Sequence, residues 1–335
     1  MAGVSKRKRQ YANITVKAKI SKYLGFVIPI LLGAGLTYYT YNSFTSAQIA
    51  QMKVHVVTAN YTYIGLSLLV AILSTVFRAY RWKYTLEKIG VSPDFKINFF
   101  AVSIGYFVNL SIPRSGEISR ALVLKKYKNV PFDKAFGTII AERMVDFFIL
   151  LLFITCALIL EFDTLKNFLI ENIPLNKLIV LLGIGAVGSL FFFYLYFFSK
   201  WGFIQYAKSK ISGLKEGALS VFKMPNKLPF LCYTLLIWFS YVLMFYLTIF
   251  ALDATSGISL RTIVVAFVIG SLTIAFTNGG FGFFPILIAK ILFLYGIPLE
   301  AGNAFGWIIW TSQLIITILL GLLAFLVLPL VAQKK

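Results

Sequence analysis

The sequence predicts an all-α polytopic membrane protein with about six spanning helices and two broken or re-entrant helical hairpins in an inverted-topology repeat. Three observations predict this fold class: the composition, the spacing of the apolar stretches, and the distribution of lysine and arginine. Of the 335 residues, 59% are hydrophobic and only 13% are charged, and the mean hydropathy is +0.84. Because about a quarter of the residues of an ordinary soluble domain are charged, this composition indicates a protein embedded in a bilayer.

Six apolar stretches are long enough to span, since a helix needs about 20 largely apolar residues to cross the hydrocarbon layer. They are Tyr23–Tyr41, Asn60–Phe77, Ala135–Leu160, Leu178–Ser199, Leu228–Leu252 and Asn303–Val331. Two further regions are interrupted. Ile97–Ile112 is short and ends at Pro113, and Thr262–Tyr295 is broken in its middle by Asn278-Gly279-Gly280-Phe281-Gly282. We expect both interrupted regions to be hairpins or pairs of short helices.

Basic residues orient the chain, because cytoplasmic loops of membrane proteins carry an excess of lysine and arginine. If the six stretches span and each interrupted region returns to its own side, 26 Lys/Arg are cytoplasmic and four are external: Lys53, Lys166, Lys177 and Arg261. If Ile97–Ile112 crossed alone, the basic loop at 200–227 would lie outside. The charge pattern therefore favours a hairpin there, a multi-pass protein of the bacterial cell inner membrane, and cytoplasmic N- and C-termini.

The two interrupted regions resemble each other in the order of their features. Ile104-Gly105 through Gly116 is echoed by Ile269-Gly270 through Gly282, and each copy continues into a turn with proline and an acidic residue, then a long apolar helix. The first copy enters from the cytoplasm and the second from outside, which defines an inverted repeat. The predicted organisation is a basic segment at 1–22, one flippase-like transmembrane domain at 23–331 with repeat halves at about 60–160 and 228–331, and a tail at 332–335.

Inverted repeats build many transporters, whose substrate site lies near the midplane where broken helices meet. The half-helices that start near Gly116 and Pro285 are expected to aim their N-terminal amides inward, and such amides bind anions. A phosphate or carboxylate ligand is the functional interpretation. The alternative is that glycine and proline break these helices only for packing.

Six charged residues fall within or beside the apolar stretches of the first half, where ionisable groups are costly and mark functional sites. Arginine binds phosphate through two parallel hydrogen bonds, and a carboxylate can take a proton. The predicted headgroup site comprises Arg114, Ser115, Gly116, Arg120, Arg143, Asn278, Gly279 and Gly280, with Glu117, Glu142 and Asp146 as a proton or ion-pair network. The alternative is an ion-pair network that fastens the half-helix to its neighbour.

Other polar residues carry less information. Arg78, Arg81, Trp82 and Lys83 lie where the second span meets the cytoplasmic interface and are interpreted as ordinary interface anchors. His55 is the one histidine, and the two cysteines are far apart, so the sequence predicts no metal site, no cofactor and no catalytic set. The +20 net charge is dispersed among loops that flank spans, which indicates contact with a membrane surface and no nucleic-acid partner.

Two motifs resemble those of the lysylphosphatidylglycerol synthase transmembrane region family. Asn109 to Arg120, followed by Ala141 to Asp146, looks like its signature, and Asn278 to Gly282 resembles its second, glycine-rich motif. The family is the flippase-like domain also found in the multiple peptide resistance factor. The resemblance implies a role in moving aminoacylated phospholipids or other polar lipids between leaflets, and implies that role for Arg114, Glu117, Arg120, Glu142, Arg143 and Asp146.

Two departures from the family pattern qualify this expectation. The chain ends at Lys335 after its last span, without the soluble catalytic domain of the synthases, so aminoacyl transfer by this polypeptide is not expected. The second motif lacks a proline at Asn278 and a following acidic residue.

Three functions are weighed on this basis. The first is a flippase or transporter of a membrane phospholipid or lipid-linked headgroup. The second is a membrane-embedded enzyme acting on a lipid headgroup or polyprenyl phosphate, with Glu142 and Asp146 as acid and base. The third is an accessory subunit, whose partner is a separate synthase or glycosyltransferase.

Overall fold

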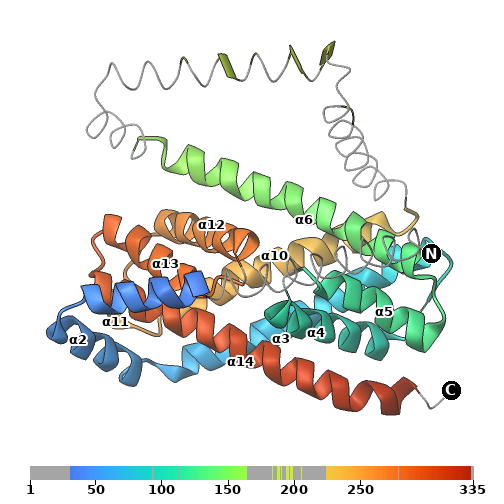
Figure 1. Cartoon of the computed structure of the whole chain (residues 1–335), viewed down its shortest axis with the longest axis horizontal. Coiled ribbons are helices and arrows are strands. Elements are labelled where there is room, and N and C mark those ends of the chain that lie inside the picture. The colour runs from blue at the N-terminus through green and yellow to red at the C-terminus, as the bar shows by residue number, and fades with distance from the viewer. Residues whose placement is uncertain are drawn as a thin grey trace, which may run out of the picture.

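The computed structural model describes residues 31–92, 94–112, 114–163, 224–277 and 279–332, together with a few residues between 183 and 205. These residues form helices and no strands, which confirms the all-α class (Figure 1). Residues 31–43 are helical. The elements that follow are α2 (Ser46–Val57), α3 (Tyr61–Glu87), α4 (Phe95–Ser111), α5 (Gly116–Lys128), α6 (Phe132–Leu160), α10 (Lys227–Ile249), α11 (Asp253–Ser256), α12 (Leu260–Phe276), α13 (Phe283–Leu294) and α14 (Leu299–Ala332).

Four of the described helices are long and apolar enough to cross a membrane, namely α3, α6, α10 and α14. They correspond to four of the six predicted spans. Of the other two, Tyr23–Tyr41 begins outside the described residues, and most of Leu178–Ser199 lies outside them. The shorter apolar helices α4, α12 and α13 fall in the two regions that the sequence predicts to be interrupted.

The described helices form two copies of one arrangement, a long helix, two short helices and a second long helix. The first copy is α3, α4, α5 and α6, and the second is α10, α12, α13 and α14. In Figure 1 the corresponding helices α6 and α14 run in opposite directions. The cross-contacts match too, because α3 packs on α10, α4 packs on α14, and α12 packs on α6. The described helices therefore have the arrangement of an inverted repeat.

Each copy contains a hairpin whose two helices cross at an equivalent glycine. A Cβ atom on Gly105 of α4 would lie 2.8 Å from Cγ of Arg120 in α5. A Cβ atom on Gly270 of α12 would lie 2.7 Å from Cε2 of Phe284 in α13. Only a residue without a side chain permits these approaches. At the open end of the first hairpin, Lys128 Nζ lies 3.7 Å from Asp94 Oδ2, so α4 starts where α5 ends.

Polar contacts join the helix ends at the two sides of the bundle. On one side Asn226 donates to Glu87 Oε2 at 3.0 Å, and on the other the amide of Asn60 donates to the carbonyl of Ala251 at 2.8 Å. The first side carries most of the described lysines, at the ends of α3 and α5 and at the starts of α4, α6 and α10: Lys83, Lys88, Lys96, Lys125, Lys126, Lys128, Lys134 and Lys227. The basic loops thus share one side of the described structure, as predicted.

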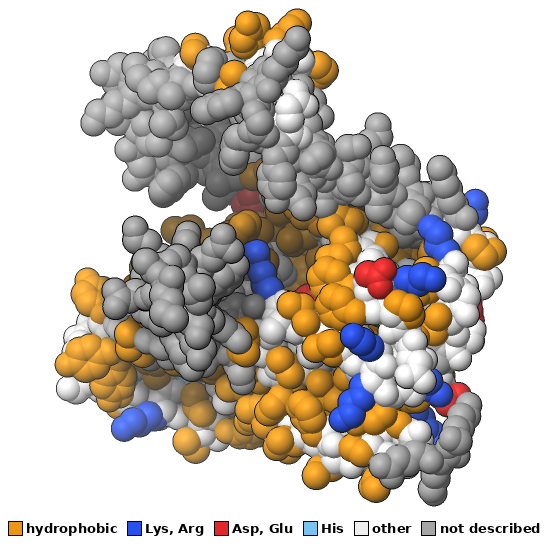
Figure 2. Space-filling view, turned by 45° about the vertical axis from the view of Figure 1, so that its right-hand side comes forward, with side chains coloured by type: hydrophobic (Ala, Val, Ile, Leu, Met, Phe, Trp, Pro, Cys, Tyr) orange, Lys and Arg blue, Asp and Glu red, His pale blue; other side chains and the backbone are white. Residues whose placement is uncertain are grey.

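Many large apolar side chains of the long helices are exposed, and Figure 2 shows a largely hydrophobic face on which a few charged side chains lie beside a hollow. An apolar exterior suits a bundle surrounded by lipid. The interior of the second half is also apolar. There the ring of Phe245 packs edge-on against Phe267 and Phe305, with centroids 6.4 and 5.4 Å apart. The first half also has an apolar core, which includes Trp82 and Ile97, but it buries charged side chains as well.

Candidate functional site

Charged side chains from three helices of the first half meet inside the bundle. We call this group the buried charge cluster. Helix α3 supplies two arginines, α5 supplies a glutamate and an arginine, and α6 supplies two carboxylates and an arginine. The members are Arg78, Arg81, Glu117, Arg120, Glu142, Arg143 and Asp146.

Asp146 is the centre of the cluster and lies at the midpoint of α6. Its Oδ1 accepts a hydrogen bond from Arg81 Nη1 at 2.6 Å, and its Oδ2 accepts from Arg81 Nη2 at 3.0 Å, which is the two-pronged geometry of a strong arginine–carboxylate pair. Arg78 Nη1 also donates to Oδ2, at 3.2 Å. Both carboxylate oxygens of Asp146 are thus engaged by α3.

Glu142, one helical turn earlier on the same face of α6, fastens the half-helix α5. Its side chain is fully buried, and its Oε2 accepts a hydrogen bond from Arg120 Nη2 at 3.1 Å. The Arg120 guanidinium lies over the ring of Trp82, 4.1 Å from the centroid, and its stem crosses Gly105. Trp82 is itself fixed, because its Nε1 donates to Thr138 Oγ1 at 3.0 Å. The predicted pairing between half-helix and span is therefore present.

The structure overturns one interpretation. Arg78, Arg81 and Trp82 are not interface anchors, because their exposures are 2%, 0% and 0%. The helix continues past the predicted end of the span, to Glu87, and carries the arginines into the packed face. A signal for this was present in the sequence. One series of buried residues recurs every three or four positions along α3, and three of its members are small and polar. The series is Ile64, Ser67, Ala71, Ser74, Arg78, Arg81 and Thr85.

Helices α4 and α10 complete the walls of the cluster with hydroxyl groups. Arg78 Nη2 donates to the hydroxyl of Tyr241 at 2.7 Å, and the hydroxyl of Tyr106 lies 3.5 Å from that of Tyr241. Arg81 Nη1 reaches Thr234 Oγ1 at 3.4 Å. The pseudo-symmetric helix α10 therefore contributes hydroxyls where α3 contributes arginines.

The cluster reaches the surface at one pair of residues. Arg143 Nε lies 3.9 Å from Glu117 Oε1, and the two side chains are 33% and 23% exposed. Arg143 Nη1 also lies 3.6 Å from Asp146 Oδ2. Arg143 thus links the accessible edge of the cluster to its centre.

The cluster has more positive charge than its own carboxylates neutralise, and several of its buried polar atoms lack a hydrogen bond. Four arginines face three carboxylates, which leaves one positive charge in surplus. The buried Nε atoms of all four arginines have no hydrogen-bond partner among the described residues, and neither do the carboxylate oxygens Glu117 Oε2 and Glu142 Oε1. A buried unpaired charge and unfilled buried donors are both unfavourable. An anion with several acceptor oxygens would relieve both.

The tip of the first hairpin carries the other predicted residues. Arg114 is exposed and has a φ of 62°, a left-handed conformation that is uncommon for a residue with a side chain. The amide of Gly116, which was predicted to face a ligand, instead donates to Asn109 Oδ1 at 2.7 Å. The hydroxyl of Ser115 donates to the carbonyl of Ile112. These two contacts shape the turn, so the arginine is the residue of the tip left for a ligand.

The tip of the second hairpin is built differently. Gly279 and Gly280 have φ values of 63° and 81°, and the carbonyl of Gly279 accepts a hydrogen bond from Trp310 Nε1 at 2.8 Å. The amide of Gly280 donates to Thr277 Oγ1 at 3.0 Å. Asn278 lies outside the described residues. Among the described residues no hydrogen bond or ion pair joins the two tips, and the charge cluster belongs to the first half together with α10.

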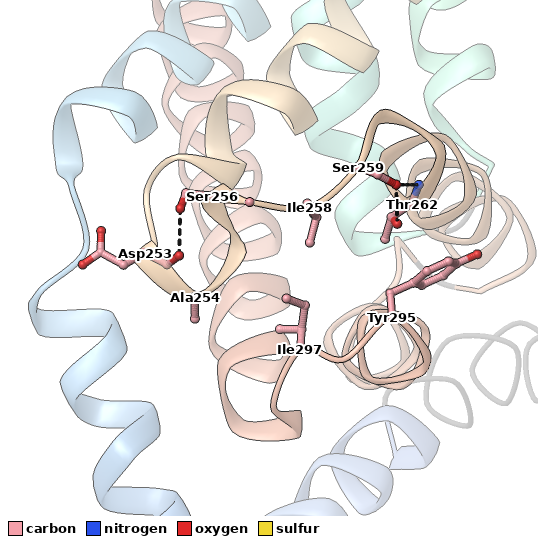
Figure 3. Close-up of a pocket in the computed structure, with 9 residues that line it drawn as sticks. Asp253, Ala254, Ser256, Ile258, Ser259, Thr262, Tyr295 and Ile297 are labelled. Carbon is pink, nitrogen blue, oxygen red and sulfur yellow. Dashed lines mark hydrogen bonds between the residues drawn. The ribbon is translucent and has the colours of Figure 1, made fainter.

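A cavity of about 540 Å³ lies elsewhere, between the end of α13 and the start of α12 (Figure 3). Its hydroxyls bond within the wall, since Ser259 pairs with Thr262 at 2.9 Å, and the Asp253 carboxylate points away from the other lining residues. Burial and the neighbouring Glu161 carboxylate raise the pKa of Tyr295 to about 12, so its phenol stays neutral. This wall offers no charge to a ligand. No group of three potential metal ligands occurs among the described residues.

Comparison with known proteins agrees with the two motifs. The family model described as lysylphosphatidylglycerol synthase TM region matches residues 26–328. The chain belongs to this family. As a member of the lysylphosphatidylglycerol synthase transmembrane region family it is a multi-pass membrane protein, and the resemblance stated from the motifs is confirmed.

Two relatives of the chain carry names without an enzymatic activity. A UPF0104 membrane protein of Methanocaldococcus jannaschii is 35% identical over 100 residues, which are 29% of this chain and 30% of the relative. A UPF0104 membrane protein of Pyrococcus horikoshii is 26% identical over 172 residues, which are 50% of this chain and 47% of the relative. The matches thus cover less than half of each relative. No solved structure matches the chain.

Proposed function

We propose that this protein moves a polar lipid with a phosphate-containing headgroup between the leaflets of its membrane, and that the buried charge cluster binds the headgroup. The observation that carries the proposal is the surplus of arginine in an apolar bundle. Four buried arginine Nε atoms lack a hydrogen-bond partner among the described residues, and those of Arg81 and Arg143 only approach a glutamate oxygen, at 3.7 and 3.9 Å. By the positive-inside rule, the lysine-rich side of the bundle faces the cytoplasm of a cell inner membrane.

A phosphate group fits this surplus. Its oxygens accept the parallel hydrogen bonds that a guanidinium donates, and its charge neutralises the unpaired arginine. A network whose task was only to fasten α5 to α6 would gain nothing from an uncompensated charge, because burying one costs several kcal/mol. The headgroup can reach the cluster at Arg143 and Glu117, which are partly exposed. Arg143 Nε and Glu117 Oε1 are 3.9 Å apart, which is too long for a hydrogen bond, so Arg143 can donate to a ligand there.

The arrangement favours transport over acid–base chemistry. Asp146, one of the two carboxylates considered for that chemistry, has both oxygens occupied by Arg78 and Arg81. A general base must reach the proton that it abstracts. Asp146 therefore serves as a fixed counter-charge that holds the arginines in place.

Reconstituted vesicles test the proposal. The full chain is placed in liposomes, and movement of a labelled phospholipid to the opposite leaflet is followed for the wild type, Arg143→Gln and Arg261→Gln. The matched control, Arg261, also pairs with a carboxylate, Glu161, at 3.8 Å, but its side chain is 57% exposed and lies outside the cluster. Loss of one charge-assisted hydrogen bond, about 1.5–3 kcal/mol, should slow Arg143→Gln about tenfold or more.

The expected outcome is movement by the wild type and the control at similar rates, with Arg143→Gln much slower. Equal rates for the wild type and Arg143→Gln contradict the role of the cluster. Movement no faster than in protein-free vesicles contradicts the transport function.

A further inference from the structure

The tip of the first hairpin adds one more positive charge, Arg114. This side chain is exposed, has no ion pair among the described residues, and lies in the turn between Ile112, the C-cap of α4, and the start of α5 at Gly116. Together with the surplus of one in the cluster, it brings the surplus positive charge at this end of α5 to two.

The second charge lies at the end of α5 where the cluster is accessible. Arg114 precedes Glu117 by three residues at the start of α5, and Glu117 is the carboxylate beside Arg143, at 3.9 Å. Two arginines and one glutamate therefore lie around the start of α5. The φ of 62° at Arg114 is a conformation that glycine adopts without cost, whereas a residue with a side chain pays a strain of about 1 kcal/mol or more. This conformation places a cation at the tip of the first hairpin.

Apolar surface surrounds this edge. Ile112 at the tip and Ile118 and Leu122 on α5 are 41%, 45% and 49% exposed. A ligand that neutralises Arg114 and Arg143 therefore has an apolar surface beside it, which suits an acyl or prenyl chain better than free water. The edge has the character of a site for an anionic amphiphile.

From these charges we infer that the site prefers a lipid whose headgroup ends in a phosphomonoester or diphosphate over one with a phosphodiester. A phosphodiester carries one negative charge and leaves one arginine unbalanced. A terminal phosphate carries close to two negative charges above pH 7 and three terminal oxygens, so it can engage both arginines at once. This inference rests on the proposed function and adds the class of headgroup that the site selects.

Ligand-induced stabilisation of the purified full chain in detergent tests the preference at pH 8. The probes are phosphatidic acid and phosphatidylglycerol with identical acyl chains, a polyprenyl phosphate, and inorganic phosphate, each titrated while the melting temperature is recorded. Phosphatidic acid or the polyprenyl phosphate is expected to bind about tenfold more tightly than phosphatidylglycerol, equal to about 1.4 kcal/mol. The better of the two identifies the tail that the apolar edge accepts.

Arg114→Gln is the diagnostic variant, because an exposed side chain can be changed without unfolding the bundle, and Lys83→Gln is its control. Arg114→Gln should bind the two phospholipids equally, while the control keeps the preference. Equal binding by the wild type, or tighter binding of phosphatidylglycerol, overturns the inference. Inorganic phosphate that stabilises the protein as well as the lipids do overturns its lipid part. Binding preference without transport would leave this inference standing and remove the proposed function, so the two failures are distinguishable.

Discussion

Replacing Asp146 by asparagine removes the charge on which three arginines depend while keeping the size of the side chain. The carboxylate lies 3.2 Å from Arg78, 2.6 Å from Arg81 and 3.6 Å from Arg143. The substitution raises the surplus charge of the cluster from one to two. Breaking a buried ion pair by removing one partner costs about 3–5 kcal/mol, because the remaining charge is left uncompensated.

Thermal unfolding in detergent measures this loss. With an entropy of unfolding of about 0.7 kcal/mol/K for a chain of this length, a loss of about 3–5 kcal/mol lowers the Tm by about 4–7 °C. The matched control is Lys83→Gln, whose ion pair with Glu87 is 46% and 25% exposed and lies 3.6 Å apart. An exposed pair is worth at most about 1 kcal/mol, so this variant should keep the wild-type Tm within about 1–2 °C.

A double-mutant cycle decides whether the interaction itself is responsible. Asp146→Asn, Arg81→Gln and the double variant are compared, and the double variant should lose clearly less than the two single losses added together. Additive losses, or an unchanged Tm in Asp146→Asn, would refute the description of the cluster as a buried, mutually dependent network.

Two further predictions concern backbone positions and use changes outside the cluster's own charges. Gly105→Ala should displace Arg120 and lower the Tm measured by thermal unfolding. In Gly137→Ala the added Cβ meets no atom within 4 Å, so the Tm should stay equal or rise slightly, because alanine favours a helix over glycine by about 0.8–1.0 kcal/mol. Equal effects of the two changes would contradict the crossing at Gly105. Trp310→Phe removes the hydrogen bond to the Gly279 carbonyl. Hydrogen exchange of the backbone amides should become faster at the tip of the second hairpin and stay unchanged at the tip of the first. Unchanged exchange at the second tip would show that this hydrogen bond does not stabilise that tip.

Periodicity and charge predict much of the chain path. The four long described helices correspond to predicted spans, because a bilayer imposes a length and a composition that can be counted. The first hairpin follows from the cost of placing a basic loop on the wrong side. The spacing of Glu142 and Asp146 also predicts that both share a face of the span, since residues four apart share a face of a helix, and Arg81 pairs with both.

The partners of those carboxylates were harder to predict. Arg78 and Arg81 follow a hydrophobic run, and arginine at the end of a span is normally an interface anchor. What decides their place is the packing of α3 against α6 and α10, which the hydropathy of one segment does not contain. The periodic small polar residues of α3 are the signal that would have placed them on the packed face.

The second hairpin illustrates a limit of reasoning from repeats. The glycines Gly105 and Gly270, which the repeat pairs in sequence, lie at the two helix crossings, because a repeat preserves the backbone path. It does not preserve side chains, and Phe284 and Ile288 lie against Gly270 where Arg120 lies against Gly105. An asymmetric site on a symmetric backbone therefore could not be predicted from the repeat alone.

An experimental structure in lipid nanodiscs that contain phosphatidic acid would test most directly whether the arginine cluster binds a lipid phosphate. Phosphate density is expected within hydrogen-bond distance of Arg143 and Arg114, with the lipid chains along the exposed face of α5. Density for lipid only around the outside of the bundle, with the separation of Arg143 and Glu117 unchanged from 3.9 Å, would contradict it.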